Sequence, residues 1–357
     1  MVFKMAANSI KMLISEGNLI HNIKHLENKY EKKILPVLKA NAYGHDIGMV
    51  SEILYNNGYR EFAVARLNEA EKILENKKIT ESRILVFESI GIEFLDIIKN
   101  NRSIEVSANT FAELKELIEN GISPDNIQLK IDFGFGRNGI VQEDIENLKK
   151  YIEEKKLFFK GIYSHLYAVE YEEGVELIEK FTEIVKYLGK GRFQMIHMQN
   201  SVGILLFGNC EIMTHLRPGI YIYGLQEEGF FHEGLKQIFR LEGKIAGVRD
   251  VSKSRYLAYN LKTTLCEKNF TYAAKIKIGY GEGFFKANEK SYCLINGKPY
   301  KILLVTMDNT FIEADELIKE GDNVILYPDV SKIRKDTGLH ICEILPAINS
   351  RIAREKI

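Results

Sequence analysis

A regular alternation of short apolar runs with amphipathic stretches over residues 16–232 constrains the fold more than any other feature of the sequence. Eight runs have strand character, among them EFAVARL at 61–67, IEVSAN at 104–109 and FKGIYSHL at 159–166. Between the runs, stretches such as TFAELKELIEN repeat apolar residues at three- and four-residue spacing, which indicates helices. Strands that alternate with helices form parallel sheets, and eight of them over about 200 residues predict a closed (β/α)₈ TIM-type barrel.

A different pattern begins at residue 233. Alternating strands, turns such as NGKP and EGDN, and few helical stretches predict a mainly antiparallel β domain over 233–357. The strand IKMLI at 10–14 precedes the barrel, so we expect residues 1–15 to pack with the β domain. The predicted fold class is α/β, with an N-terminal (β/α)₈ barrel over 16–232 and a C-terminal β domain.

Composition excludes several classes of function. Lys+Arg and Asp+Glu number 49 each, so no net field would attract nucleic acid or an anionic membrane surface. No apolar stretch approaches the roughly 20 residues of a spanning helix, and the opening MVFKMAANSIKML lacks the core of a signal peptide. Cys210, Cys266, Cys293 and Cys342 are widely separated, which is typical of a reducing compartment. We expect a soluble, cytoplasmic protein without nucleic-acid or membrane partners.

Polar side chains gather where the predicted barrel strands end, at the face where TIM-type barrels form their active sites. In VLKANAYGHD at 37–46, a single lysine directly follows an apolar run. Alone, such a lysine is most often a solvated surface residue. Seven of the eight strand ends carry polar groups, however, and this density predicts a site built from Lys39, Tyr43, Arg66, Asn109, Lys130, Arg137, His165, Asn200, Ser201 and Arg217.

The types of these residues point to one chemistry. The sequence has no cluster of Asp, Glu and His at ligand spacing, so we expect no metal, and it has no GxSxG motif. An amine on a rigid strand suits Schiff-base chemistry, because burial and neighbouring cations lower its pKa. Ser201-Val202-Gly203, Pro218-Gly219-Ile220 and the Tyr43 hydroxyl offer anion-binding groups on the same face. Pyridoxal 5′-phosphate (PLP) is therefore the cofactor that we expect.

VLKANAYGHD also resembles the PLP-lysine segment of the alanine racemase family, PLP enzymes with a barrel and a β domain. The resemblance continues in the family's order through FAVARLNEA, LKIDFGFGRNG, YSHL, MQNS, LRPGIYIYG, IGYGEGF and TMDN, and covers nearly the whole chain. It implies a racemase that interconverts L- and D-alanine, with Lys39 bound to the cofactor aldehyde. Arg217 is similar to the arginine that faces the pyridine nitrogen, although an arginine here could equally bind phosphate or an ion-pair partner.

Racemisation needs an acid and a base on opposite faces of a planar intermediate. The resemblance implies that Lys39 serves one face and that a tyrosine of the partner subunit's β domain serves the other. LAYNLKTT places Tyr259 there; Tyr256 is the alternative, and Asn260 stands where the family has glycine. The resemblance thus implies a homodimer with shared active sites.

The resemblance assigns supporting roles to further residues. His165 is similar to the histidine that contacts the catalytic tyrosine and links it toward Arg217. Arg137 and Met307 match substrate-binding positions, and Lys130 matches a lysine that is carbamylated in many members. Cofactor-binding positions of the family correspond to Tyr43, Asn200, Ser201, Arg217, Gly219 and Ile220.

One departure leaves alternatives open. Where the family often has a tyrosine that narrows the pocket entrance, INSRIAREKI has Ser350 at or near the position. Strict alanine preference is therefore less secure than racemisation, and a racemase that prefers serine or another amino acid is the first alternative. A PLP decarboxylase of the same fold and a non-catalytic PLP-binding protein are further alternatives. The sequence lacks acidic decarboxylase motifs, and its full β domain disfavours the non-catalytic protein.

Overall fold

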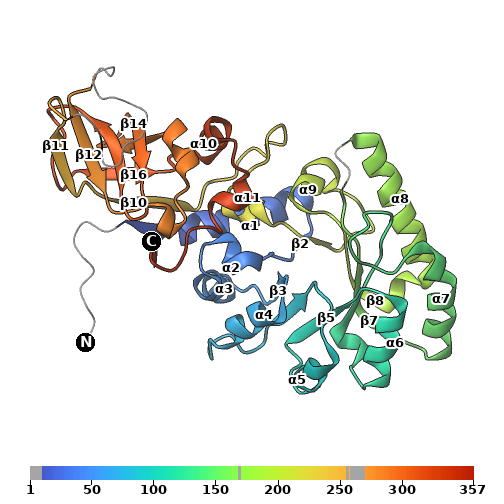
Figure 1. Ribbon diagram of the computed structural model, residues 1–357. Helices are drawn as coiled ribbons and strands as arrows, with labels where there is room; N and C mark the ends of the chain where they lie inside the picture. The colour runs from blue at the N-terminus through green and yellow to red at the C-terminus, as the bar shows by residue number, and fades with distance from the viewer. Residues whose placement is uncertain (1–9, 168–169, 255–256, 258–269) are drawn as a thin grey trace.

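Parallel strands in chain order form most of the barrel in the computed structural model, which describes residues 10–167, 170–254, 257 and 270–357 (Figure 1). Six strands pair in sequence: β3 (Glu61–Val64), β4 (Arg83–Val86), β5 (Ile104–Ala108), β6 (Ile127–Lys130), β7 (Phe159–Tyr163) and β8 (Phe193–His197). A second sheet pairs β2 (Lys33–Ile34) with β9 (His215–Leu216). A bridge from Val37 to Ala63 and a hydrogen bond from Thr214 N to Ile196 O join the two sheets and close the barrel. The predicted barrel is confirmed.

Amphipathic helices cover the outside of the barrel. Ser15 begins the first helix, because its hydroxyl accepts a hydrogen bond from Asn18 N at 3.2 Å, and Thr110 caps α6 in the same way. β5 and β7 are buried along their whole lengths, as expected for strands covered on both faces. The helices are α1 (Glu16–Tyr30), α3 (Ile47–Asn56), α4 (Leu67–Leu74), α5 (Leu95–Lys99), α6 (Phe111–Glu119), α7 (Ile145–Glu154), α8 (Tyr171–Leu188) and α9 (Ser201–Phe207).

Among the described residues, strands of the C-terminal part of the chain and one strand from near the N-terminus form a mainly antiparallel nine-stranded sheet beside the barrel (Figure 1). The strand near the N-terminus, β1 (Lys11–Ile14), joins this sheet between β10, to which it is antiparallel, and β17, to which it is parallel. The other elements are β10 (Phe239–Lys244), β11 (Gly247–Asp250), β12 (Tyr272–Ile276), β13 (Tyr292–Ile295), β14 (Lys298–Val305), β15 (Thr310–Ala314), β16 (Asn323–Leu326), α10 (Val330–Thr337), α11 (Ile341–Ile344) and β17 (Ala353–Lys356). Among the described residues, no helix is long and apolar enough to cross a membrane.

Candidate active site

A cavity of about 230 Å³ opens at the carboxyl ends of the barrel strands and collects most of the predicted site residues. Met307 does not line it, because Met307 lies on an exposed loop of the β domain. Tyr259 and its alternative Tyr256 lie outside the described residues. The predicted residues that line the cavity are Lys39, Tyr43, Lys130, Arg137, His165, Asn200, Ser201, Arg217, Gly219 and Ile220.

Lys39 begins a left-handed turn, α2 (Lys39–Tyr43), and not a simple strand end. Ala40, Asn41 and Ala42 have φ of 54–56°, and Tyr43 has φ of 52°. Side chains in this conformation cost roughly 1–2 kcal/mol per residue, so surrounding contacts must hold the turn. One such contact is a hydrogen bond of 2.6 Å from Ala40 N to Glu69 Oε1.

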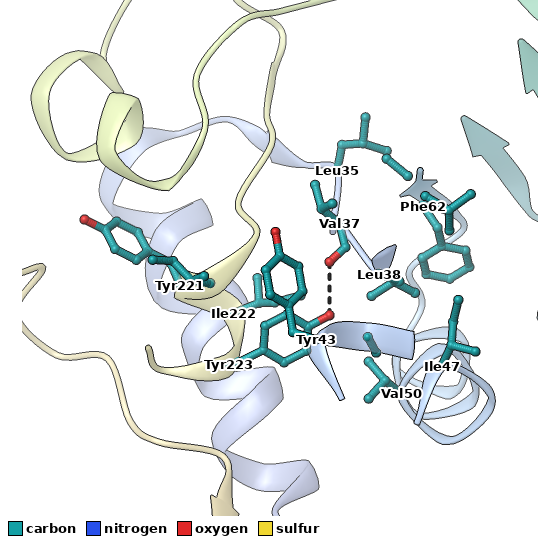
Figure 2. Packing of buried hydrophobic residues seen from close by; sticks show 14 of the residues in the cluster. Leu35, Val37, Leu38, Tyr43, Ile47, Val50, Phe62, Tyr221, Ile222 and Tyr223 are labelled. Carbon is teal, nitrogen blue, oxygen red and sulfur yellow. Dashed lines mark hydrogen bonds between the residues drawn. The ribbon is translucent and has the colours of Figure 1, made fainter. Parts of the chain in front are cut away.

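Aromatic packing supports the end of this turn (Figure 2). The Tyr223 hydroxyl donates to the Val37 carbonyl oxygen at 3.0 Å, and the Tyr43 ring packs against Tyr223 with centroids 5.1 Å apart. His45 stacks on the Tyr223 ring at 4.7 Å, and burial lowers the pKa of His45 to about 4. A neutral, fully buried histidine therefore follows the turn.

Arg217 lies buried at the floor of the cavity. Its Nη2 donates to the Ser164 carbonyl oxygen at 2.8 Å, and its Nη1 lies 2.6 Å from His197 Nδ1. The guanidinium also lies over the rings of Phe87 and Tyr163, 5.4 and 5.2 Å from their centroids. Burial lowers the pKa of Arg217 to about 10, which still leaves a cation at neutral pH.

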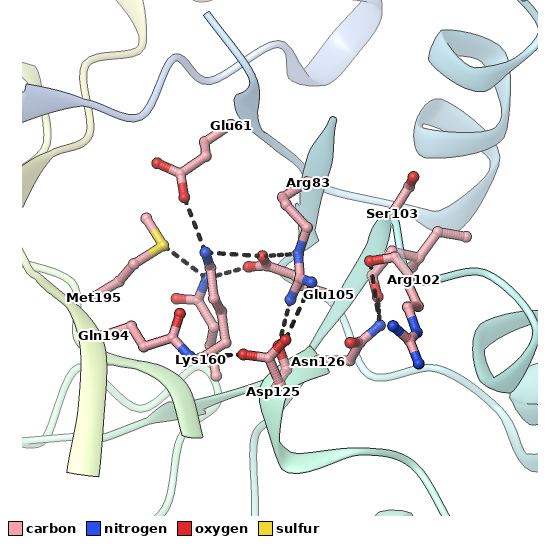
Figure 3. A network of polar contacts seen from close by, with 12 residues as sticks. Glu61, Arg83, Arg102, Ser103, Glu105, Asp125, Asn126, Lys160, Gln194 and Met195 are labelled. Atoms are coloured by element: carbon pink, nitrogen blue, oxygen red, sulfur yellow. Dashed lines mark hydrogen bonds and ion pairs between the residues drawn. The ribbon is translucent and has the colours of Figure 1, made fainter. Parts of the chain in front are cut away.

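A chain of buried polar groups leads from Arg217 into the barrel. His197 Nε2 lies 2.8 Å from Gln128 Oε1, and Gln128 Nε2 donates to Glu105 at 2.5 Å. Glu105 also pairs with Arg83 at 2.8 Å and with Lys160 at 3.7 Å (Figure 3). The Glu105 carboxylate only accepts hydrogen bonds, so it fixes which end of the Gln128 amide faces it. The Gln128 oxygen therefore faces His197, and because that oxygen also only accepts, His197 must carry its proton on Nε2. His197 Nδ1 is then an acceptor for the guanidinium.

Hydroxyl groups and backbone amides form one wall of the cavity. Ser201 Oγ accepts from Gly219 N at 3.1 Å and from Tyr221 N at 3.4 Å. A Cβ on Gly219 would collide with the Tyr43 hydroxyl, so glycine allows that hydroxyl to approach the backbone. Asn200 begins α9 by accepting from Gly203 N at 2.9 Å. This wall offers neutral donors for the phosphate of a cofactor.

The loop after β6 brings cationic groups to the cavity. Asp132 organises the loop by accepting from the backbone amides of Gly134, Phe135 and Gly136 at 2.9–3.1 Å. The Arg137 guanidinium lies over the Phe135 ring at 4.8 Å. With Lys39, Lys130 and Arg217, this arginine makes the cavity cationic, so the cavity could bind carboxylate and phosphate groups.

Burial and the positive charges of the cavity lower the pKa values of His165 and Lys130. Burial, with the charges of Arg217 and Arg137, lowers the pKa of His165 to about 3, so its imidazole is neutral. Its Nε2 lies 3.4 Å from Asn200 Nδ2. Burial, with Arg137 and Arg217, also lowers the pKa of Lys130 to about 8, and the Lys130 amine contacts Asn138 Oδ1.

The structure adds residues that sequence reasoning missed. His197 contacts Arg217; its only sequence signal is an inward position at the end of FQMIH. From the C-terminal segment, Cys342 lines the cavity, whereas Ser350 is exposed and does not line it. Cys342 lies in α11 and Ser350 lies beyond that helix, and the effect of Ser350 on substrate preference stays a prediction. The other missed lining residues are Val37, Phe87, Tyr163 and Glu227, and Val202 lines the cavity within the predicted Ser201-Val202-Gly203 segment.

Glu227, His340 and Cys342 form a polar cluster at the mouth. Their potential metal-ligating atoms lie within 4.8 Å of one another. Arg334 Nη1 approaches the Glu227 carboxylate at 3.8 Å, and His340 Nδ1 accepts from Cys342 N at 3.1 Å. Glu227 thus already faces the cation Arg334, and His340 already accepts from a backbone amide. We therefore describe the cluster as an ion-pair network and not as a metal site.

Fold and site together define a TIM-type barrel whose cationic cavity, at the carboxyl ends of the strands, contains a lysine amine. The family models for the N-terminal and C-terminal domains of alanine racemase match residues 14–227 and 238–356. Alanine racemases of Fusobacterium nucleatum and Chlorobaculum tepidum are 32% and 28% identical. The alignments cover 96% and 97% of this chain, and 98% and 95% of the relatives. The chain belongs to the alanine racemase family.

Solved structures share the fold. The alanine racemase of Clostridium difficile 630 superposes with a TM-score of 0.86 at 24% identity, over 99% of this chain and 97% of that one. The alanine racemase of Bartonella henselae with covalently bound pyridoxal phosphate superposes with a TM-score of 0.83 at 22% identity. This superposition covers 98% of this chain and 99% of that one. These likenesses support a barrel with an attached β domain throughout the chain.

Proposed function

We propose that this chain is a PLP-dependent racemase that interconverts L- and D-alanine. The observation that carries the proposal is the Lys39 amine in one cavity with Arg217 on the floor and the Ser201 and Tyr43 hydroxyls on the wall. These groups fit the cofactor: the Lys39 amine suits its aldehyde, Arg217 suits its ring nitrogen, and the two hydroxyls suit its phosphate. Bound PLP supplies an electron-withdrawing ring that makes the Cα proton of an amino acid removable.

Arg217 controls how strongly that ring withdraws electrons. A carboxylate beside the ring nitrogen would keep the nitrogen protonated, whereas an arginine only donates and cannot take up a proton there. Its orientation comes from Ser164 O and His197 Nδ1, which leave it no freedom to turn away. The expected consequence is that charge stays near Cα, where reprotonation completes racemisation.

Lys39 handles the proton on one face of the substrate. Burial first, and then Arg137 and Arg217, lower the pKa of Lys39, which favours the neutral amine that can take up a proton. The proposed second base is the partner subunit's Tyr259. The described tyrosines of the cavity are poorer candidates, because burial raises the pKa of Tyr163 to about 12 and raises that of Tyr43 as well.

The remaining roles complete the proposal. Arg137 would bind the substrate carboxylate, with Lys130 beside it and Met307 contributed by the β domain. His165 would support the partner's Tyr259. We also propose the division into residues 1–15, 16–232 and 233–357, a homodimer and a cytoplasmic location. The proposed cofactor contacts are those of Lys39, Tyr43, Asn200, Ser201, Arg217, Gly219 and Ile220.

A second candidate is a racemase of the same fold with measurable or preferred turnover of serine. The observation in its favour is that a small side chain, Cys342, is the C-terminal group that lines the cavity. A larger aromatic group at this position would leave less room for a hydroxymethyl side chain.

Exchange of the Cα hydrogen of L- and D-alanine in D₂O, followed by NMR together with chiral analysis, tests racemisation directly. Exchange from both enantiomers with formation of the mirror image is the expected result, and the absence of exchange by PLP-loaded protein would contradict the proposal. A comparison of kcat/KM for alanine, serine and lysine then ranks the substrates, with alanine expected first. A higher kcat/KM for serine would favour the second candidate.

A further inference from the structure

The last strand of the β domain contacts the turn that carries Lys39. Arg354, in β17, donates to the Gly44 carbonyl oxygen through Nε at 3.2 Å and through Nη2 at 3.0 Å. The same guanidinium donates to the carbonyl oxygens of Ile348, Asn349 and Ile352. Among the described residues, Arg354 has no ion-pair partner, so its donors serve backbone carbonyls.

Gly44 is the residue at which the left-handed turn ends. Its φ is 85°, and a Cβ there would collide with the carbonyl of Leu345 just after α11. The C-terminal segment therefore packs directly on the end of the turn. Within the barrel, Glu69 holds the opposite end through Ala40 N, as described above. The turn is thus held at one end by the barrel and at the other by the β domain.

We propose that Arg354 is a positioning residue for Lys39. By holding the Gly44 carbonyl, it keeps four non-glycine residues in the left-handed conformation, and that conformation directs the Lys39 amine into the cavity. The β domain would then control the reactive lysine of its own chain, in addition to any contribution across a dimer. This inference rests on the proposed function only for the role of Lys39, because the geometry of the turn is a property of the protein alone.

The turn itself can be measured without cofactor. Hydrogen exchange of the peptide that spans 37–50, followed by mass spectrometry on the full-length apo protein, reports whether the turn is held. Arg354→Met keeps an unbranched side chain that fills the path of the arginine stem and removes its donors. We expect the amides of this peptide to exchange at least ten times faster than in wild type. Lys356→Met is the matched control, since Lys356 lies on the same strand and pairs with Glu16, away from the turn.

A glycine substitution in the turn, Ala40→Gly, tests whether Arg354 positions the turn or only supports the C-terminal segment. Ala40 is exposed and has φ of 54°, so Ala40→Gly removes a conformational penalty without loss of buried contact. In the Arg354→Met background it should restore at least a third of the lost exchange protection. In holoenzyme, Arg354→Met should lower kcat for alanine at least tenfold with little change in KM, and Ala40→Gly should recover part of kcat.

Several outcomes would overturn the proposal. Unchanged exchange in Arg354→Met would show that the barrel alone holds the turn, and a loss that Ala40→Gly does not relieve would show that Arg354 only supports the C-terminal segment. If Arg354→Met does not fold, Arg354→Lys keeps a charge and should show an intermediate increase in exchange; wild-type exchange would contradict the proposal. Wild-type protein without racemase activity would sink the proposed function, while the apo exchange data would still decide the role of Arg354.

Discussion

Two lysines line the cavity, and the hydrogen bonding of their amines differs. Lys130 is 4% exposed at the end of β6, where its amine contacts Asn138 Oδ1. Lys39 is half-buried, and no described side-chain acceptor forms a hydrogen bond to its amine. Of the two, Lys39 therefore has the amine that is free to react with an aldehyde.

The first prediction follows from this difference. Borohydride reduction of PLP-loaded protein and peptide mapping should place the adduct on Lys39. Lys39→Ala should abolish the adduct and lower racemisation by at least a thousandfold, because the same amine moves the proton. Lys130→Met serves as the matched control and should retain the adduct. An adduct on Lys130 in wild type would contradict the assignment.

His45 supports a prediction about acid sensitivity. Its folded pKa is about 4, below the roughly 6.5 of an unfolded histidine. Between these values the unfolded chain binds a proton that the folded protein does not, so stability falls as pH decreases from about 6.5 to about 4. At pH 5 the loss from His45 is about 2 kcal/mol. Urea unfolding of wild type and His45→Asn should show a shallower pH dependence for the variant. Equal slopes would contradict the prediction.

At the scale of secondary-structure elements, the barrel strands β4, β5 and β7 share a buried charge network. Glu105 on β5 is 2% exposed and accepts from Arg83 on β4, with Lys160 on β7 nearby. Each cation also has a second carboxylate, Asp125 for Arg83 and Glu61 for Lys160 (Figure 3). The network therefore ties β4 to its neighbour β5 and reaches across β6 to β7.

Removal of the central charge should destabilise the barrel. Glu105→Gln leaves the buried Lys160 and the partly buried Arg83 with one fewer carboxylate. The expected cost is about 3 kcal/mol, at the low end for a broken buried pair because the second carboxylates remain. Thermal melting followed by circular dichroism measures it. Glu146→Gln, which removes an exposed pair with Lys150 on α7, is the control and should leave the melting temperature nearly unchanged. Equal melting temperatures for all three proteins would contradict the role of Glu105.

At the scale of the whole molecule, the proposed reaction needs two subunits. The described part of one chain places Lys39 in the cavity, and the proposed second base belongs to the β domain of a partner. An isologous two-fold dimer would combine each Lys39 with the partner subunit's Tyr259 and form two identical sites. The proposal therefore predicts that activity depends on the dimer.

Subunit exchange tests this prediction. Lys39→Ala and Tyr259→Phe should each be nearly inactive, but a mixed dimer has one site with both defects and one site with neither. With random exchange about half of the dimers are mixed, so activity should recover to roughly a quarter of wild type. A mixture of Lys39→Ala with Tyr256→Phe serves as a comparison for the alternative tyrosine. No recovery despite demonstrated exchange would mean that Lys39 and Tyr259 act within one chain or that another tyrosine is the base.

The barrel was predictable from its apolar patterns. Strands buried on both faces give short continuous apolar runs, and helices buried on one face give apolar residues at three- and four-residue spacing. β4 has a continuous run of buried apolar residues, Ile84, Leu85 and Val86, as such a strand requires, and α8 has helical spacing. Lys39 was predictable from an abrupt change from apolar to polar residues. His197 and Cys342 were not, because inward orientation at a strand end and delivery by α11 leave no period in the sequence.

The sequence by itself determined the succession of strands and helices, the cationic set at the strand ends and the family to which they belong, since these depend on local pattern and residue type. Tertiary structure alone decided the left-handed turn at Lys39, the contact of Arg354 with Gly44 and the path from Arg217 through His197 to Glu105. The physical reason is that each of these depends on contacts between residues distant in the chain. Only the folded barrel and its β domain bring those residues within hydrogen-bonding distance.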